Sequence, residues 1–204
     1  MGFKKFKIID DVVDYFQLSF QKENFLVDTK QEKMPDFLKS ELDYILTNIP
    51  YKVSEAAIRE NILYPILKEV FKKYDDTLML WANKSISFSK ELSGMPDYIL
   101  AKQSERGKII FGKPLLAVVE AKKDDFEGGW AQCLLEMYTI QKINGKPEIP
   151  VFGIVSNGDN WEFGKLDNDV FIQIENFYTI LELDTFFSAL STFFELCKKS
   201  AEKL

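Results

Sequence analysis

PLLAVVEAK, from Pro114 to Lys122, is the segment that indicates the fold class most clearly. The five residues after the proline are all apolar, and the run then ends abruptly in charge at Glu120. A short, continuous apolar run is typical of a strand that is buried on both faces of a sheet. We therefore expect this stretch to be the central strand of an α/β protein.

Predicted strands and helices lie on both sides of this central strand. Period-two alternation and short apolar runs predict strands at 85–89, 96–101, 108–111, 151–156, 161–166 and 169–174. Helical spacing of apolar residues predicts helices at 10–20, 36–46, 55–74, 130–143 and 177–204. Pro65 should kink the third helix near Asn61 to Tyr64, because proline has no N–H to donate. The order predicts an α/β sandwich with a mixed sheet.

The length of 204 residues predicts a single domain over 1–204. We divide it into an N-terminal helical accessory segment (1–50), a core (51–175) and a C-terminal helix (176–204). Cys133 and Cys197 have no metal-type spacing, so we expect two buried thiols in a reducing compartment. Apolar runs stay well short of the roughly 20 residues of a membrane span. A cytoplasmic protein without a membrane partner is therefore expected.

The composition excludes several kinds of chemistry. The chain contains no histidine, which removes serine–histidine and cysteine–histidine catalysis and histidine-ligated zinc. Its 26 basic and 32 acidic residues give a net charge of −6, which disfavours a surface that coats nucleic acid indiscriminately. Between Lys84 and Lys123, however, eight basic residues stand against four acidic ones. A local basic face is therefore expected there.

Charged residues are concentrated where the central strand ends. Glu120 and Lys122 are two residues apart, so both side chains project from the same face of the strand. Asp97 follows Pro96 at the start of the neighbouring predicted strand, and antiparallel pairing would bring it beside Glu120. Two carboxylates that converge need a cation, and hard oxygen ligands suit Mg²⁺ or Mn²⁺.

This pattern resembles the PD-(D/E)XK nuclease superfamily. Pro96-Asp97 is followed 23 residues later by Glu120-Ala121-Lys122, which completes the core signature. The piece SEAAIRENILYPIL is similar to the helix that precedes the first core strand in the nuclease domains of type I restriction subunits, and Glu55 matches its glutamate. Gln132 matches a glutamine that many relatives carry in the helix after the E-x-K strand. The resemblance covers roughly residues 50–165.

The resemblance implies a restriction-endonuclease-like α/β/α sandwich and a metal-dependent endonuclease that acts on DNA. Asp97, Glu120 and the Ala121 carbonyl would hold one or two Mg²⁺ or Mn²⁺ ions. Lys122 would orient the attacking water and offset negative charge. Glu55 would act as a ligand or position the metal's water shell, and Gln132 would orient Lys122 or a phosphate.

Each of these residues has a simpler interpretation, and the function has alternatives. Asp97 could be a turn residue, Glu120 and Lys122 a solvated strand end, Glu55 a partner of the helix dipole, and Gln132 a surface residue. A nuclease-fold protein that binds nucleic acid or a partner without cutting is the main alternative. A metal enzyme that acts on a small phosphoester is another. The phenylalanine-rich stripe of the C-terminal helix could be core or a homodimer contact.

Overall fold

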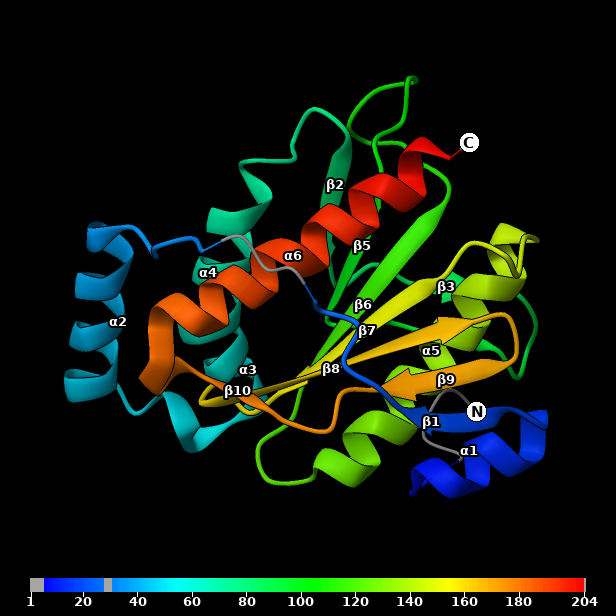
Figure 1. Ribbon diagram of the computed structural model, residues 1–204, viewed down its shortest axis with the longest axis horizontal. Coiled ribbons are helices and arrows are strands. Elements are labelled where there is room, and N and C mark those ends of the chain that lie inside the picture. Colours follow the sequence, from blue (N-terminus) through cyan, green and yellow to red (C-terminus); the bar gives the residue numbers. More distant parts are fainter. Residues whose placement is uncertain (1–5, 28–30, 204) are drawn as a thin grey trace.

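A mixed sheet with helices on both of its faces forms the fold (Figure 1). This computed structural model describes residues 6–27 and 31–203. Eight strands of the described chain pair in this sheet. Seven of them follow one another in the order β1 (Ser19–Lys22), β9 (Val170–Gln173), β8 (Asn160–Asp167), β7 (Val151–Ser156), β6 (Leu115–Ala121), β5 (Tyr98–Lys102) and β2 (Leu78–Ala82), and β10 (Tyr178–Thr179) pairs with β8. The prediction of an α/β protein with a central mixed sheet is confirmed.

The predicted central strand lies in the middle of the sheet. β6 pairs antiparallel with β5 and parallel with β7. Its apolar residues Leu115 to Val119 are all buried. Full burial of a leucine or valine side chain contributes about 1.5–3 kcal/mol, so this strand alone accounts for a sizeable part of the core.

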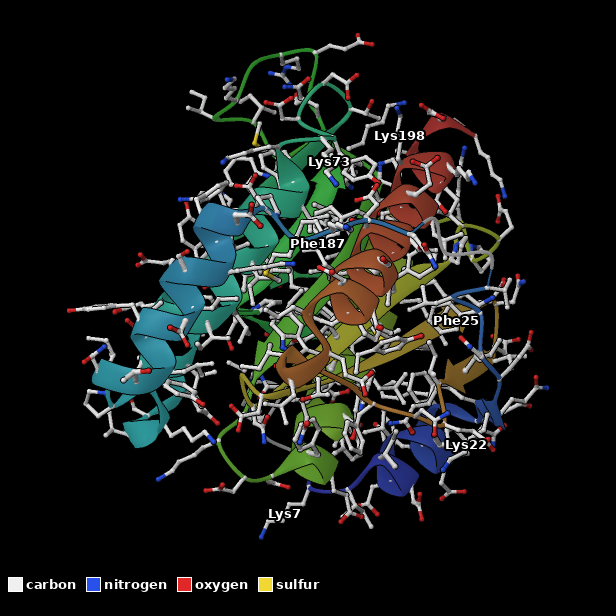
Figure 2. The ribbon with its side chains drawn as sticks, turned by 60° about the vertical axis from the view of Figure 1, so that its left-hand side comes forward. Lys7, Lys22, Phe25, Lys73, Phe187 and Lys198 are labelled. Atoms are coloured by element: carbon white, nitrogen blue, oxygen red, sulfur yellow. The ribbon has the colours of Figure 1, made fainter. Side chains whose placement is uncertain are left out.

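Two helical layers cover the sheet. On one face, α6 (Leu183–Glu202) crosses the strands beside α2 (Asp36–Asn48), α3 (Glu55–Ile58) and α4 (Tyr64–Phe71), as Figure 1 shows. Figure 2 shows Phe187 on the inner side of α6 with Lys73 near it, and the ammonium lies 5.0 Å from the ring centroid. On the other face, α5 (Phe126–Asn144) packs on β6 and β7, and α1 (Ile9–Phe16) packs on α5. The charged end of β6 therefore lies between two helical layers.

The helix between residues 55 and 71 is irregular at its centre. A π-helical segment, η3 (Arg59–Leu63), separates α3 from α4. Pro65 follows it and has no N–H to donate to the carbonyl of Asn61. The predicted place of the disturbance was therefore right, and its form is a π-helical turn. Such turns occur frequently at functional sites.

Several local predictions are confirmed. The strands β5, β7, β8 and β9 lie where alternation and apolar runs placed them, and β7 and β8 form the predicted hairpin. Cys133 and Cys197 are buried free thiols, and burial raises the pKa of each.

Other predictions need correction. The first fifty residues are not only helical, because β1 joins the sheet by pairing parallel with β9. Residues 108–111 form turns, since Ile109 is 85% exposed and finds no strand to pair with in the described chain. The predicted strand at 85–89 shrinks to β3 (Ile86–Ser87), which pairs with β4 (Ser93–Gly94) outside the main sheet. The last helix begins at Leu183, after β10 and the 3₁₀ turn η4 (Ile180–Glu182), and Leu204 lies outside the described residues.

Candidate active site

Asp97 and Glu120 meet at one end of the sheet. The register pairs Tyr98 with Val119, so the residue before β5 lies opposite Glu120. The Asp97 N–H donates to Glu120 Oε1 at 3.2 Å, and the Ala121 N–H donates to Asp97 Oδ2 at 2.8 Å. Each of the two carboxylates that the sequence predicted as neighbours therefore accepts a hydrogen bond from the backbone beside the other.

Gln132 links Lys122 to Glu120. Its side-chain oxygen accepts a hydrogen bond from Lys122 Nζ at 2.9 Å, and its Nε2 donates to Glu120 Oε2 at 2.7 Å. Lys122 Nζ also lies 3.9 Å from Glu120 Oε2. A Cβ at Gly129 would meet Lys122 Cγ at 2.7 Å, so the absence of a side chain there lets the lysine stem run along α5.

Glu55 reaches the same cluster from the opposite helical layer. It is the first residue of α3, after Ser54 caps the helix by accepting a hydrogen bond from the Ala57 N–H. Its carboxylate lies 3.8 Å from Lys122 Nζ, and its side chain is 50% exposed. The structure thus brings Glu55 to the lysine, and Ala121 lies beside them with its N–H bound to Asp97.

Arg59 is a member of the site that sequence reasoning missed. Its guanidinium forms a short ion pair with Asp97 Oδ1 and donates to Asn83 Oδ1 at 3.1 Å. Partial burial lowers the pKa of Arg59, but the charge and hydrogen bond of Asp97 outweigh this effect, and the pKa ends above its usual value. The one available signal was its position one helical turn after Glu55.

Glu136 is the second missed residue. It lies one turn after Gln132 on α5, where Gln132 Nε2 donates to its Oε1 at 3.1 Å. Its side chain is fully buried, and Oε2 has no hydrogen-bond partner among the described residues. Burial, together with the charge of Glu120 and a hydrogen bond to it, raises the pKa of Glu136 well above the usual value. Its surroundings therefore favour the neutral form of the carboxyl group over the charged form.

Glu120 is the buried carboxyl group on which the burial and the charges of the cluster act together. Only 1% of the residue is exposed. Burial and then the charge of Asp97 raise its pKa to about 7, although Glu136, Lys122 and the Asp97 N–H act in the opposite direction. A carboxylate in this position is stabilised by added positive charge, which is the property of a cation-binding group.

The oxygen donors fit a hard divalent cation. Across residues 6–27 and 31–203, no three histidine, cysteine, aspartate or glutamate side chains are grouped to hold a metal by themselves. Mg²⁺, however, is commonly bound by one or two carboxylates with waters and substrate phosphates completing its shell. Asp97 and Glu120 supply such a pair, and their like charges converge. The residues present therefore suit Mg²⁺ or Mn²⁺.

A cleft of about 380 Å³ opens beside Lys122 and Gln132. The N-terminal segment forms part of its wall, which sequence reasoning did not foresee. Its lining consists of Phe6, Lys7, Glu55, Lys122, Asp125, Gly128 and Gln132. Figure 2 shows Lys7 pointing outward at the end of the molecule where α5 begins. Two lysines and two acidic residues, Glu55 and Asp125, thus line the cleft.

The expected basic face between Lys84 and Lys123 is divided by the topology. Lys122 and Lys123 follow β6 at the candidate site. Four other basic residues lie at the opposite end of these strands, where Lys102 ends β5 and the connection to β6 contains Arg106, Lys108 and Lys113. The topology therefore separates Lys122 and Lys123 from these four residues, and Lys7 and Arg59 join Lys122 at the site.

Comparison of the chain with protein-family models, with curated proteins and with solved structures found no match. In the part of the chain that the structure describes, none of the helices combines the length and the apolar character that a membrane crossing requires.

Proposed function

We propose that the protein is a metal-dependent nuclease of the PD-(D/E)XK type with a restriction-endonuclease-like arrangement of its core. One observation carries the proposal. Asp97, Glu120 and Lys122 belong to one hydrogen-bonded cluster at the end of the buried strand β6, with Gln132 between the lysine and the glutamate. Structural charges are usually dispersed and solvated, whereas catalytic groups are concentrated and partly desolvated.

The chain's own residues divide the work. Asp97 and Glu120, with the Ala121 carbonyl, would hold Mg²⁺ or Mn²⁺. When bound, such an ion lowers the pKa of a coordinated water and stabilises charge on a phosphate. Lys122 is positioned by Gln132 and Glu55 to orient the attacking water and to offset negative charge. This chemistry needs no histidine, and the chain has none.

A phosphodiester, and DNA in particular, is the substrate class that we assign to the site. The net charge of the chain is −6, so attraction of nucleic acid must be local. Lys7 and Lys122 line the cleft, and Arg59 lies at Asp97 within the same cluster. These are the basic groups that a backbone phosphate would meet as it approaches Asp97 and Glu120, beside the carboxylates of Glu55 and Asp125 that also line the cleft.

The test is cleavage of supercoiled plasmid with Mg²⁺ or Mn²⁺ by the wild type and Lys122→Ala. We expect metal-dependent nicking that Lys122→Ala lowers by about 10²-fold or more, because a positioned charge at the reacting phosphate is lost. Lys123→Ala changes the adjacent, exposed lysine and should leave the rate unchanged. Metal-dependent cutting that survives Lys122→Ala would contradict the site assignment.

A nuclease-fold protein that binds nucleic acid or a partner without cutting is the second candidate function. The four carboxylate oxygens of Asp97 and Glu120 all have partners in the structure, and one of these partners is the cation Arg59. The presence of a partner at every oxygen favours a structural ion cluster. Absence of cutting of any nucleic acid, together with no Mn²⁺ binding by calorimetry, would decide for this alternative.

A further inference from the structure

Arg59 occupies the side of Asp97 that faces the α3 layer. Its guanidinium pairs with Asp97 Oδ1, while Asp97 Oδ2 accepts from the Ala121 N–H. Side-chain exposures of 25% for Arg59 and 16% for Asp97 place the pair at the boundary of the interior. An ion pair at such a position is screened less than a surface pair.

The backbone of Arg59 has contacts of its own, separate from those of its head group. The Arg59 carbonyl accepts a hydrogen bond from the Tyr98 hydroxyl at 3.2 Å, and the residue begins the π-helical segment η3. The guanidinium itself has one neutral partner, Asn83, and one charged partner, Asp97. If Asp97 were neutralised by another cation, the head group would lose its charged partner while its backbone stayed in place.

We propose that Arg59 is an internal counter-ion of Asp97 that a divalent metal must displace, and that the displaced guanidinium then binds a phosphate of the nucleic acid. The inference rests on the proposed function and deepens it. A divalent ion at Asp97 competes with the guanidinium for the same carboxylate. An arginine matches a phosphate with two parallel N–H donors, so a backbone phosphate is a suitable second partner.

Displacement of Arg59 by the metal makes the binding of metal and the binding of nucleic acid cooperative. Metal binding alone must break the Arg59–Asp97 pair, and this cost weakens its affinity. A phosphate that receives the released guanidinium removes part of the cost. By linkage, nucleic acid then tightens metal binding, and metal tightens nucleic acid binding by the same factor.

The experiment is calorimetric titration of Mn²⁺ into the wild type, Arg59→Met and Arg106→Met. The chain has two arginines, and Arg106 is exposed at the far end of β5, so it is a matched control. We expect Arg59→Met to bind Mn²⁺ about tenfold more tightly than the wild type, within the usual range of coupling between two sites. Arg106→Met should bind as the wild type does.

A second set of titrations contains a short DNA duplex with phosphorothioate linkages, which slow hydrolysis. The duplex should tighten Mn²⁺ binding by the wild type about fivefold or more, and clearly less by Arg59→Met. Arg59→Lys keeps the charge but loses the planar fork, and we expect it to bind Mn²⁺ alone about threefold more tightly than the wild type. This variant keeps the test decisive where Arg59→Met does not fold.

The outcomes separate the inference from the proposed function. Equal or weaker Mn²⁺ binding by both Arg59 variants, when the wild type binds Mn²⁺, overturns the counter-ion role alone. A duplex effect of equal size in the wild type and Arg59→Met overturns the phosphate role. Absence of Mn²⁺ binding in every protein overturns the metal site itself, and the inference falls with it.

Discussion

The two ends of the β5–β6 pair receive polar side chains from the same helix and use them differently. At the far end, Asn144 completes the backbone of β6 by accepting from the Leu115 N–H at 2.9 Å and donating to its carbonyl at 2.7 Å. At the candidate site, Gln132 instead bonds to the charged side chains of Lys122 and Glu120. The Asn144 amide thus stabilises a strand, whereas the Gln132 amide positions charged side chains.

The surrounding charges differ in the same way. The far connection, residues 103–113, carries solvated basic groups, and Lys113 Nζ donates to the backbone carbonyl of Ile143. The site end holds the buried carboxyl groups of Glu120 and Glu136 and the Arg59–Asp97 pair. Charges that remain in water cost the fold little, whereas buried charges are expensive. The free-energy cost of burying these charges points to a functional role at the carboxyl end of β6.

The largest expected effect is a difference between substitutions of two aspartates, one at the candidate site and one at the far end of the sheet. Asp97→Ala should lower metal-dependent cleavage by about 10³-fold or more, because it removes a metal ligand and the partner of Arg59. Asp76→Ala should leave the rate unchanged, since Asp76 is exposed and precedes β2 at the far end. The measurement is single-turnover plasmid cleavage. A substantial rate in Asp97→Ala would remove Asp97 from the site.

Gln132→Ala and Asn144→Ala compare the two amides directly. Each should lower the free energy of unfolding by about 1–3 kcal/mol, because each leaves buried polar groups without partners. Urea unfolding measures this cost. Only Gln132→Ala should also reduce cleavage beyond the fraction that is unfolded. Equal cleavage by the two folded variants would show that Gln132 is only structural.

The pH dependence of the stability of Glu136→Gln tests the cost of burying a carboxyl group at this position. Burial and the charge of Asp97 raise the pKa of Glu120 from 4.5 to about 7, and burial and the charge of Glu120 raise the pKa of Glu136 well above its usual value. Between pH 4.5 and 7 the folded protein holds protons that the unfolded chain has released, so the free energy of unfolding falls as pH rises. Glu136→Gln retains a neutral side chain and should stabilise the protein by about 1–2 kcal/mol at pH 8, with a smaller gain at pH 5.

Thermal unfolding at the two pH values provides this measurement. Glu105→Gln is the control, because Glu105 is exposed in the far connection. It should leave the pH profile unchanged. A Glu136→Gln variant that is less stable than the wild type at pH 8 would contradict a raised pKa of Glu136.

The smallest effect is expected for the basic residues of the far connection. Lys108→Ala and Arg106→Ala should change the free energy of unfolding by less than about 0.5 kcal/mol, as is usual for exposed charges. Neither should alter plasmid cleavage. A marked loss of DNA binding by either variant, measured by fluorescence anisotropy, would show that the nucleic acid path extends to the far end.

Local patterns predicted the centre of the fold and failed at its edges. The run after Pro114 predicted β6 because a strand buried on both faces has an unambiguous composition. β1 was missed because all four of its residues are exposed and its pairing with β9 joins residues far apart in the sequence. The apolar residues at 108–111 predicted a strand. A strand, however, also needs another strand with a free edge to pair with, and the whole sheet determines whether one is available.

The site shows the same limit. Asp97, Glu120 and Lys122 were predicted together because strand pairing and the period of two settle their positions. Arg59 was missed because its partner Asp97 lies 38 residues further along the chain. Glu136 was missed because it lies within an apolar helix, where burial and the charge of Glu120 raise its pKa. Contacts of this kind require the three-dimensional arrangement of both helical layers.

The most direct test of the central claim is calorimetric titration of Mn²⁺ into the wild type, Glu120→Gln and Glu105→Gln. We predict that the wild type and Glu105→Gln bind Mn²⁺ alike. Glu120→Gln, which keeps the shape of the buried side chain and removes its charge, should bind at least about a hundredfold more weakly, because loss of a ligand exceeds the usual effect of an outer-shell change. Equal binding by the wild type and Glu120→Gln, or no binding by the wild type, would contradict the account.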